Sequence, residues 1–284
     1  MKSLNLRAED FEKSEKLLRR IYKDTADSYK IAIEGGNVLG GKIFSAESNT
    51  GVLIILRITD FIVSYISFET DPEKSVILAI EKHIEKITSG SEECRYININ
   101  GENLSIIQHF ENGPYTKDRE SVEYIFSGKK KSNIKLSPKL ERKEFDEENF
   151  EDYIWLLDTA LRPLLIIEGQ MLDPYRRNVN RSYTVLTDAA ETGDFGAYWK
   201  DDSIVALYLL RENLILDLVV NPIYQNQGIG SAILSDILAT LMKSHSEVLL
   251  YVSKKNAGAM RFYEKMGFKR TASNADFTYS PPKK

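Results

Sequence analysis

Residues 213–231 read N-L-I-L-D-L-V-V-N-P-I-Y-Q-N-Q-G-I-G-S, and this stretch decides the interpretation of the whole chain. Leu214–Val220 is an apolar run interrupted only by Asp217, which predicts a buried strand that ends before Pro222. From Gly228 onward the apolar residues take a helical spacing. The positions that share one face of this predicted helix are Ile229, Ile233, Ile237 and Leu241.

The glycines stand where this predicted strand passes through a turn into the helix. The first turn of a helix carries N–H groups without partners and the positive end of the helix dipole. Gly228 and Gly230 carry no side chain that would keep an anion away from those groups. The turn therefore suits a phosphate or pyrophosphate. It is neither a Walker loop, which needs G-K-[ST], nor the three-glycine Rossmann fingerprint.

A second stretch starts at Asn256 and reads N-A-G-A-M-R-F-Y-E-K-M-G-F. Asn256 is a favourable helix N-cap, and it shares one helix face with Ala259 and Tyr263, because the seven residues from Asn256 to Tyr263 make nearly two turns. A helix and the predicted strand Val248–Val252 separate this stretch from the glycine turn.

Together, the motif Q-x-x-G-x-G at Gln225 and the run F-Y-E-K-M-G-F resemble the GNAT superfamily of N-acyltransferases. The resemblance implies an acetyl-CoA site, with pantetheine paired to a strand backbone and the pyrophosphate on the glycine turn. The residues that it assigns to acetyl-CoA are Leu218, Val219, Val220, Gln225, Asn226, Gln227, Gly228, Ile229, Gly230, Ser231, Asn256, Ala259 and Tyr263.

The resemblance also makes Tyr263 the acid that protonates the departing thiolate. A phenol with a pKa near ~10 can donate to a thiolate near ~8.5. Asp217, a carboxylate amid apolar residues, is the candidate base for the acceptor's proton. The alternatives are a core aromatic for Tyr263, a buried ion pair for Asp217 and a purely capping role for Asn256.

The first half of the chain repeats the predicted element order of the second. Asn103 aligns with Asn256, and Phe110 then falls on Tyr263. The glycine turn is matched by residues 73–77, where Val76 and Ile77 would crowd a pyrophosphate. We therefore expect residues 1–134 to be a degenerate GNAT-like domain without an acyl-CoA site. Residues 135–284 are the expected catalytic domain.

The predicted fold class is α/β in the mixed α+β sense, with two GNAT-like domains, each a mostly antiparallel sheet flanked by helices. A turn is expected at Gly40–Gly41. A helix is expected to be capped by Asn149 and interrupted at Pro163, and a final strand pair is expected over residues 269–279. A basic stretch over residues 128–142 is interpreted as a linker or as an anion-binding patch.

Composition limits the classes of partner. A net charge of −4 argues against nucleic acid, and no apolar run is long enough for a membrane span. The start of the sequence has no apolar signal region, and a single cysteine, Cys94, favours a reducing compartment, so a cytoplasmic location is expected. No ligand cluster has metal-binding spacing, so no metal is expected. A homodimer is left open.

The expected function is transfer of an acetyl group from acetyl-CoA directly to a primary amine. Two alternatives stay open: a non-catalytic acyl-CoA sensor or partner-binding module, and a tandem enzyme that builds a small thiol or peptide-like metabolite. The sequence identifies neither the acceptor nor the length of the acyl chain.

Overall fold

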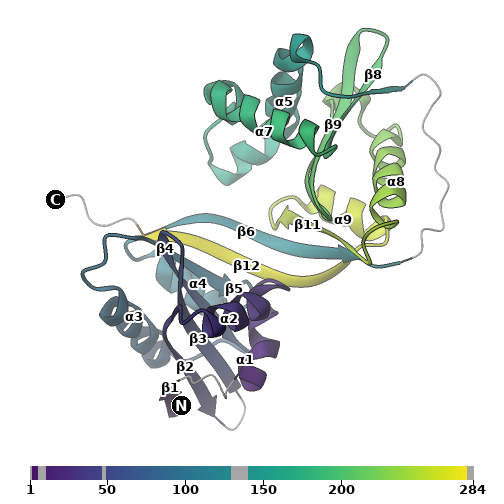
Figure 1. Ribbon diagram of the computed structural model, residues 1–284. Coiled ribbons are helices and arrows are strands. Elements are labelled where there is room, and N and C mark those ends of the chain that lie inside the picture. Colours follow the sequence, from purple (N-terminus) through teal and green to yellow (C-terminus); the bar gives the residue numbers. More distant parts are fainter. Residues whose placement is uncertain (1, 6–10, 47–48, 129–139, 280–284) are drawn as a thin grey trace. The chain divides into compact units, whose positions relative to one another are not determined.

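A computed structural model describes residues 2–5, 11–46, 49–128 and 140–279, and the chain divides into two units (Figure 1). The first unit comprises Met1–Glu123 and Arg270–Lys284, and the second comprises Tyr124–Lys269. The boundary predicted between residues 134 and 135 lies outside the described residues. The prediction placed the C-terminal segment in the second domain, whereas here it groups with the first unit.

The first unit is a sheet with helices packed on both faces. Its strand order is β1-β2-β3-β4-β5-β12. Residues of α3 and α4 pack on one face, and residues of α1 and α2 pack on the other. Its elements are β1 (Lys2–Asn5), α1 (Phe11–Leu18), α2 (Thr25–Glu34), β2 (Val38–Ala46), β3 (Asn49–Ile58), β4 (Phe61–Phe68), α3 (Lys74–Thr88), β5 (Cys94–Asn100), α4 (Leu104–Glu111), most of β6 (Tyr115–Phe126) and most of β12 (Lys269–Tyr279).

The second unit is built in the same way, with strand order β7-β8-β9-β10-β11. One buried cluster joins α5 and α7 to β8, β9 and β10, while α8 lies on the other side of the strands (Figure 1). Its elements are β7 (Glu141–Lys143), a 3-10 turn (Glu147–Asn149), α5 (Phe150–Glu168), α6 (Pro174–Arg177), α7 (Val179–Glu191), β8 (Phe195–Lys200), β9 (Ser203–Arg211), β10 (Leu214–Val220), a second 3-10 turn (Pro222–Tyr224), α8 (Ile229–Leu241), β11 (Val248–Ser253) and α9 (Ala257–Lys265).

The predicted fold class is confirmed: both units combine helices with a mixed, mostly antiparallel sheet. In each unit, two antiparallel pairings are followed by one parallel pairing. β2–β3–β4–β5 in the first unit corresponds to β8–β9–β10–β11 in the second. This shared order is what a repeat requires. None of the helices in the described part of the chain is long and apolar enough to cross a membrane.

Four local predictions are wrong. Gly40–Gly41 lies within β2, where a Cβ on Gly40 would stand 2.4 Å from Ile87 Cδ1, so this glycine permits close packing rather than a turn. α5 continues through Pro163, which is exposed, so water can satisfy the carbonyl left without an N–H donor. Asn149 makes no capping bond through its side chain. The expected final strand pair is one strand, β12, which pairs with β5.

Candidate active site

A cavity of about 600 Å³ opens in the second unit, at the end of β10, at the first turn of α8 and along α9. Its lining comes from those three elements and from the glycine turn that joins β10 to α8. The residues that line it are Leu218, Val220, Tyr224, Gln225, Asn226, Gly228, Gly230, Ser231, Asn256, Gly258, Ala259, Phe262, Tyr263 and Lys265.

Most of the residues predicted to bind acetyl-CoA therefore meet in this cavity. Val219, Gln227 and Ile229 do not line it: the Val219 side chain packs in the core, and the Gln227 amide nitrogen donates to the Ile223 carbonyl at 3.1 Å. Four lining residues escaped the sequence analysis. They are Tyr224, Gly258, Phe262 and Lys265. All four lie within or beside the two quoted stretches, but no spacing rule singles them out.

The glycine turn has the backbone geometry of an anion site. Gly228 is the N-cap of α8 with φ 81°, and Asn226 also has a positive φ of 60°. Both residue types adopt this left-handed conformation readily. The Gln225 side chain braces the turn by donating to the Val220 carbonyl at 2.9 Å. The turn is therefore held open in front of the N–H groups of the first turn of α8, where an anion is stabilised.

Gly230 stands inside this first turn, and its missing side chain faces the cavity wall. A Cβ there would lie 3.6 Å from Val220 Cγ2 and 3.7 Å from Phe262 Cζ, which are ordinary contacts. Gly230 is thus not required by local packing, in contrast to Gly228, where φ itself favours glycine. Its absent side chain instead leaves space in the cavity.

β10 and β11 pair over a short length only. The parallel register joins Leu214 to Leu249 and Ile215 to Leu250, and beyond these pairs β10 and β11 are no longer paired with each other. β10 stays paired to β9 as far as Val220. A register shift between Ile215 and Asp217 marks a bulge at this point. The side of β10 that faces β11 beyond this bulge can therefore accept an added extended chain.

Tyr263 projects into the cavity from α9. Asn256 caps this helix, since its Oδ1 accepts from the Ala259 N–H at 3.0 Å. The predicted capping bond is present, and Asn256 also lines the cavity. Burial and the negative charge of Asp217 raise the pKa of Tyr263 above its usual value. The phenol therefore keeps its proton at neutral pH.

The Asp217 side chain lies on the same face of β10 as that of Val219 and on the opposite face from that of Leu218. Burial raises the pKa of this carboxyl, and a hydrogen bond opposes the rise. That bond comes from the Tyr175 hydroxyl, which donates to Asp217 Oδ2 at 3.2 Å. Among the described residues no cationic side chain forms an ion pair with Asp217. The structure therefore does not support the ion-pair alternative over the described part of the chain.

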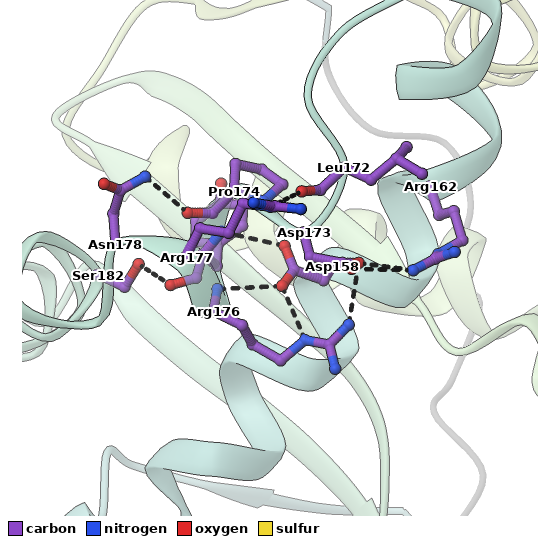
Figure 2. A network of polar contacts seen from close by, with 10 residues as sticks. Asp158, Arg162, Leu172, Asp173, Pro174, Arg176, Arg177, Asn178 and Ser182 are labelled. Atoms are coloured by element: carbon purple, nitrogen blue, oxygen red, sulfur yellow. Dashed lines mark hydrogen bonds and ion pairs between the residues drawn. The ribbon is translucent and has the colours of Figure 1, made fainter.

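Tyr175 was not identified from the sequence, because it lies on α6, a four-residue helix without periodicity. The α6 turn is fixed by Asp158, a fully buried carboxylate on α5. Asp158 accepts from the backbone N–H groups of Tyr175 and Arg176, each at 3.1 Å, and from Arg176 Nε at 3.0 Å. Figure 2 shows Asp158 in the middle of this network, with Arg176 beside it.

Asp173 extends the same network. Its carboxylate accepts from Arg162 at 2.8 Å and pairs with Arg176 at 2.9 Å (Figure 2). From α7, the Ser182 hydroxyl donates to the Tyr175 carbonyl at 2.8 Å. The backbone of Tyr175 is therefore held by side chains of both α5 and α7.

The corresponding place in the first unit is closed. β4 and β5 pair without interruption from Phe61↔Cys94 to Ile66↔Ile99. At the end of β4, the side chain of the buried Asn103 accepts from the Phe68 N–H at 2.9 Å and donates to its carbonyl at 3.3 Å. Phe110 is fully buried in the core. The backbone groups that an extended ligand would need are thus already bonded.

The charge of the cavity wall is also informative. Lys265 is a lining residue, and the described lining contains no carboxylate. Together with the helix dipole of α8, this lysine favours an anionic ligand. No group of three or more His, Cys, Asp or Glu side chains is placed to hold a metal ion within the described residues.

Comparisons with known proteins agree with this geometry. Residues 182–270 match the family model of the acetyltransferase (GNAT) domain. A GCN5-related N-acetyltransferase from Sphaerobacter thermophilus is 13% identical, with a TM-score of 0.55, over 97% of this chain and 95% of that one. A GNAT-family acetyltransferase from Colwellia psychrerythraea is 12% identical, with a TM-score of 0.50, over 98% and 100%. No curated protein matches the sequence. The second half of the chain therefore contains a GNAT domain, which supports acyltransferase activity, and the solved structures share the fold of the chain.

Proposed function

We propose that the second unit is an N-acetyltransferase that takes its acetyl group from acetyl-CoA and transfers it directly to a primary amine. The observation that carries the proposal is the coincidence, in one cavity, of the glycine turn at the start of α8, the unpaired part of β10 and the Tyr263 hydroxyl. These are a site for pyrophosphate, a site for an extended amide chain and a proton donor.

The donor would bind along two of these features. The pantetheine amides would pair with the backbone of β10 from Leu218 to Val220, as an added strand does, with the Val220 carbonyl shared with the Gln225 side chain. The pyrophosphate would bind the N–H groups at the start of α8, beside Gly228 and Gly230. Lys265 at the rim would add a positive charge for a phosphate. The other residues of the glycine turn would contribute to the pyrophosphate site through their backbone.

The reaction needs a base and an acid. The acceptor enters as an ammonium ion and must lose a proton, which Asp217 accepts directly or through water. The free amine nitrogen then attacks the thioester carbonyl, forming the new C–N bond as the C–S bond breaks. Tyr263 gives its proton to the departing thiolate. Burial and the charge of Asp217 raise the pKa of Tyr263, so the phenol is protonated and can donate to the thiolate as the C–S bond breaks.

The first unit would not bind acyl-CoA. The support is the continuous β4–β5 pairing and the Asn103 side chain that occupies the backbone groups of Phe68. We infer that it is a degenerate copy of the same fold.

The experiment is a screen for consumption of acetyl-CoA with the full-length chain over amines, polyamines, aminoglycosides and peptide N-termini. Free thiol release and the mass of the product are measured together, so that thioester hydrolysis is distinguished from transfer. Transfer to an amine with an increase of one acetyl group supports the proposal. Tight binding of acetyl-CoA without transfer to any acceptor would instead support the non-catalytic alternative, a sensor or partner-binding module.

A further inference from the structure

The α6 segment is a feature that the first unit lacks. In the second unit, α5 spans 19 residues and is followed by α6 before α7 begins, whereas α1 spans eight residues and the described residues between α1 and α2 include no helix. Aligning Asn103 with Asn256 gives an offset of 153 (256 − 103), and aligning Phe11 with Phe150 gives 139 (150 − 11). The difference means that the second half has about 14 additional residues before its last helix. Part of this addition, α6, carries Tyr175, whose hydroxyl bonds the Asp217 carboxylate.

The residue that receives Tyr175 also differs between the units. The end of β10 at Val220 corresponds to the end of β4 at Phe68. In this alignment of the two units, Tyr65 occupies the position of Asp217. The half with the open cavity therefore has both the partly buried carboxylate and the extra segment that contacts it. The half with the closed backbone has neither at these positions.

A partly buried carboxylate without a cationic partner is costly, so its presence on β10 needs a reason. Asp217 receives one hydrogen bond, from Tyr175, and it acts electrostatically on Tyr263. An arriving ammonium group would supply the missing positive charge. The carboxylate must be ionised and correctly oriented for that purpose, and both conditions depend on the donor beside it.

We propose that Tyr175 is the positioning residue of the acceptor side, holding the Asp217 carboxylate toward a cationic primary amine, and that the Asp158-anchored α6 turn fixes its hydroxyl there. The inference rests on the proposed function, since it concerns the acceptor of that transfer. It specifies that the acceptor binds as an ammonium ion. The Tyr175 hydroxyl itself neither gains nor loses a proton during the reaction.

The groups that act on this pair come from four elements. Tyr175 on α6 donates a hydrogen bond to Asp217, and the charge of Asp217 acts on Tyr263 of α9. Asp158 on α5 and Arg181 on α7 act on Tyr175 through their charges. Loss of the Tyr175 hydroxyl removes the contribution that opposes burial. The pKa of the Asp217 carboxyl then rises further, and the ionised form is populated only at higher pH.

The test is a carbon NMR titration of the full-length chain with ¹³C-labelled aspartate carboxyls, in which the D217N variant identifies the Asp217 signal. Tyr175→Phe should move the Asp217 titration to higher pH. The matched control is Tyr183→Phe on α7, which removes a hydroxyl bonded to another carboxylate, Glu147, and should leave the signal in place. An unchanged Asp217 titration in Tyr175→Phe overturns the inference, whether or not the chain shows turnover.

The kinetic arm uses the pH dependence of kcat/KM for the best acceptor found. Tyr175→Phe should move the acid limb to higher pH and lower kcat/KM at neutral pH about tenfold, with recovery as the pH rises. In the D217N background, the same substitution should have no further effect. Equal effects in both backgrounds would assign Tyr175 a structural role and overturn the proposal. Absence of turnover in the parent would contradict the proposed function, and the NMR titration still decides the inference.

Discussion

Gly230→Asp separates ligand binding from folding at the anion site. Gly230 lies in the first turn of α8, and a Cβ there makes only ordinary contacts, at 3.6 Å to Val220 and 3.7 Å to Phe262. Replacing a helical glycine is worth a few tenths of a kcal/mol, and an acidic residue near a helix N-terminus adds roughly 0.3–1 kcal/mol. The free energy of unfolding should therefore stay constant or rise by about 0.5–1 kcal/mol.

The same carboxylate would stand where the pyrophosphate binds. Two unit charges about 4 Å apart repel by about 4 kcal/mol at an effective dielectric constant of about 20, and solvent at the rim lowers this value. We expect acetyl-CoA affinity to fall by about 2–4 kcal/mol, roughly 30- to 1,000-fold in Kd. The assay is calorimetric titration with acetyl-CoA, alongside a melting curve of each variant.

Gly230→Asn is the control, because it matches the size of aspartate without its charge. It should lose distinctly less affinity than Gly230→Asp. A folded Gly230→Asp variant that binds acetyl-CoA like the parent would refute the anion-site assignment, and equal losses in both variants would show that bulk rather than charge is responsible. Gly228 is the poorer position for this test, because its φ of 81° makes any substitution strain the turn.

Three further predictions concern single side chains. Tyr263→Phe should lower kcat ~10²–10⁴-fold, while the acetyl-CoA Kd and the melting temperature stay near the parent values; an unchanged kcat would remove Tyr263 from the mechanism. Asn103→Ala should lower the free energy of unfolding by about 1–3 kcal/mol, because the Phe68 N–H loses its acceptor, and a denaturation midpoint equal to the parent's would contradict this. Burial raises the pKa of Asp217, so its ionised form destabilises the fold above the unfolded-state pKa of ~3.9, and Asp217→Asn should raise the melting temperature at pH 7–8 by an amount that shrinks as the pH falls toward 4. Equal melting temperatures of the two proteins at pH 8 would argue against a buried charge.

Much of the second unit could be predicted because its signals are local. β10 has the bounds that its apolar run and the following Pro222 predict. α9 begins where Asn256 offers a cap, and the glycine turn follows β10 directly. The cavity joins these two neighbouring stretches, so the sequence already contained most of its lining.

The acceptor side was beyond local patterns. Tyr175 reaches Asp217 across 42 residues of sequence, and its position depends on the buried Asp158, which lies 17 residues before it. Neither contact leaves a periodic trace in a four-residue helix. The pairing of β12 with β5 has the same origin, because strand partners distant in sequence are chosen by the assembled sheet.

The central claim is that the chain has one acyl-CoA site, in its second unit. Calorimetric titration of the full-length protein with acetyl-CoA tests this most directly, with Gly230→Asp measured in parallel. We expect a stoichiometry near one acetyl-CoA per chain and loss of that binding in the variant. Two equivalent sites per chain, or one site that Gly230→Asp leaves intact, would contradict the account.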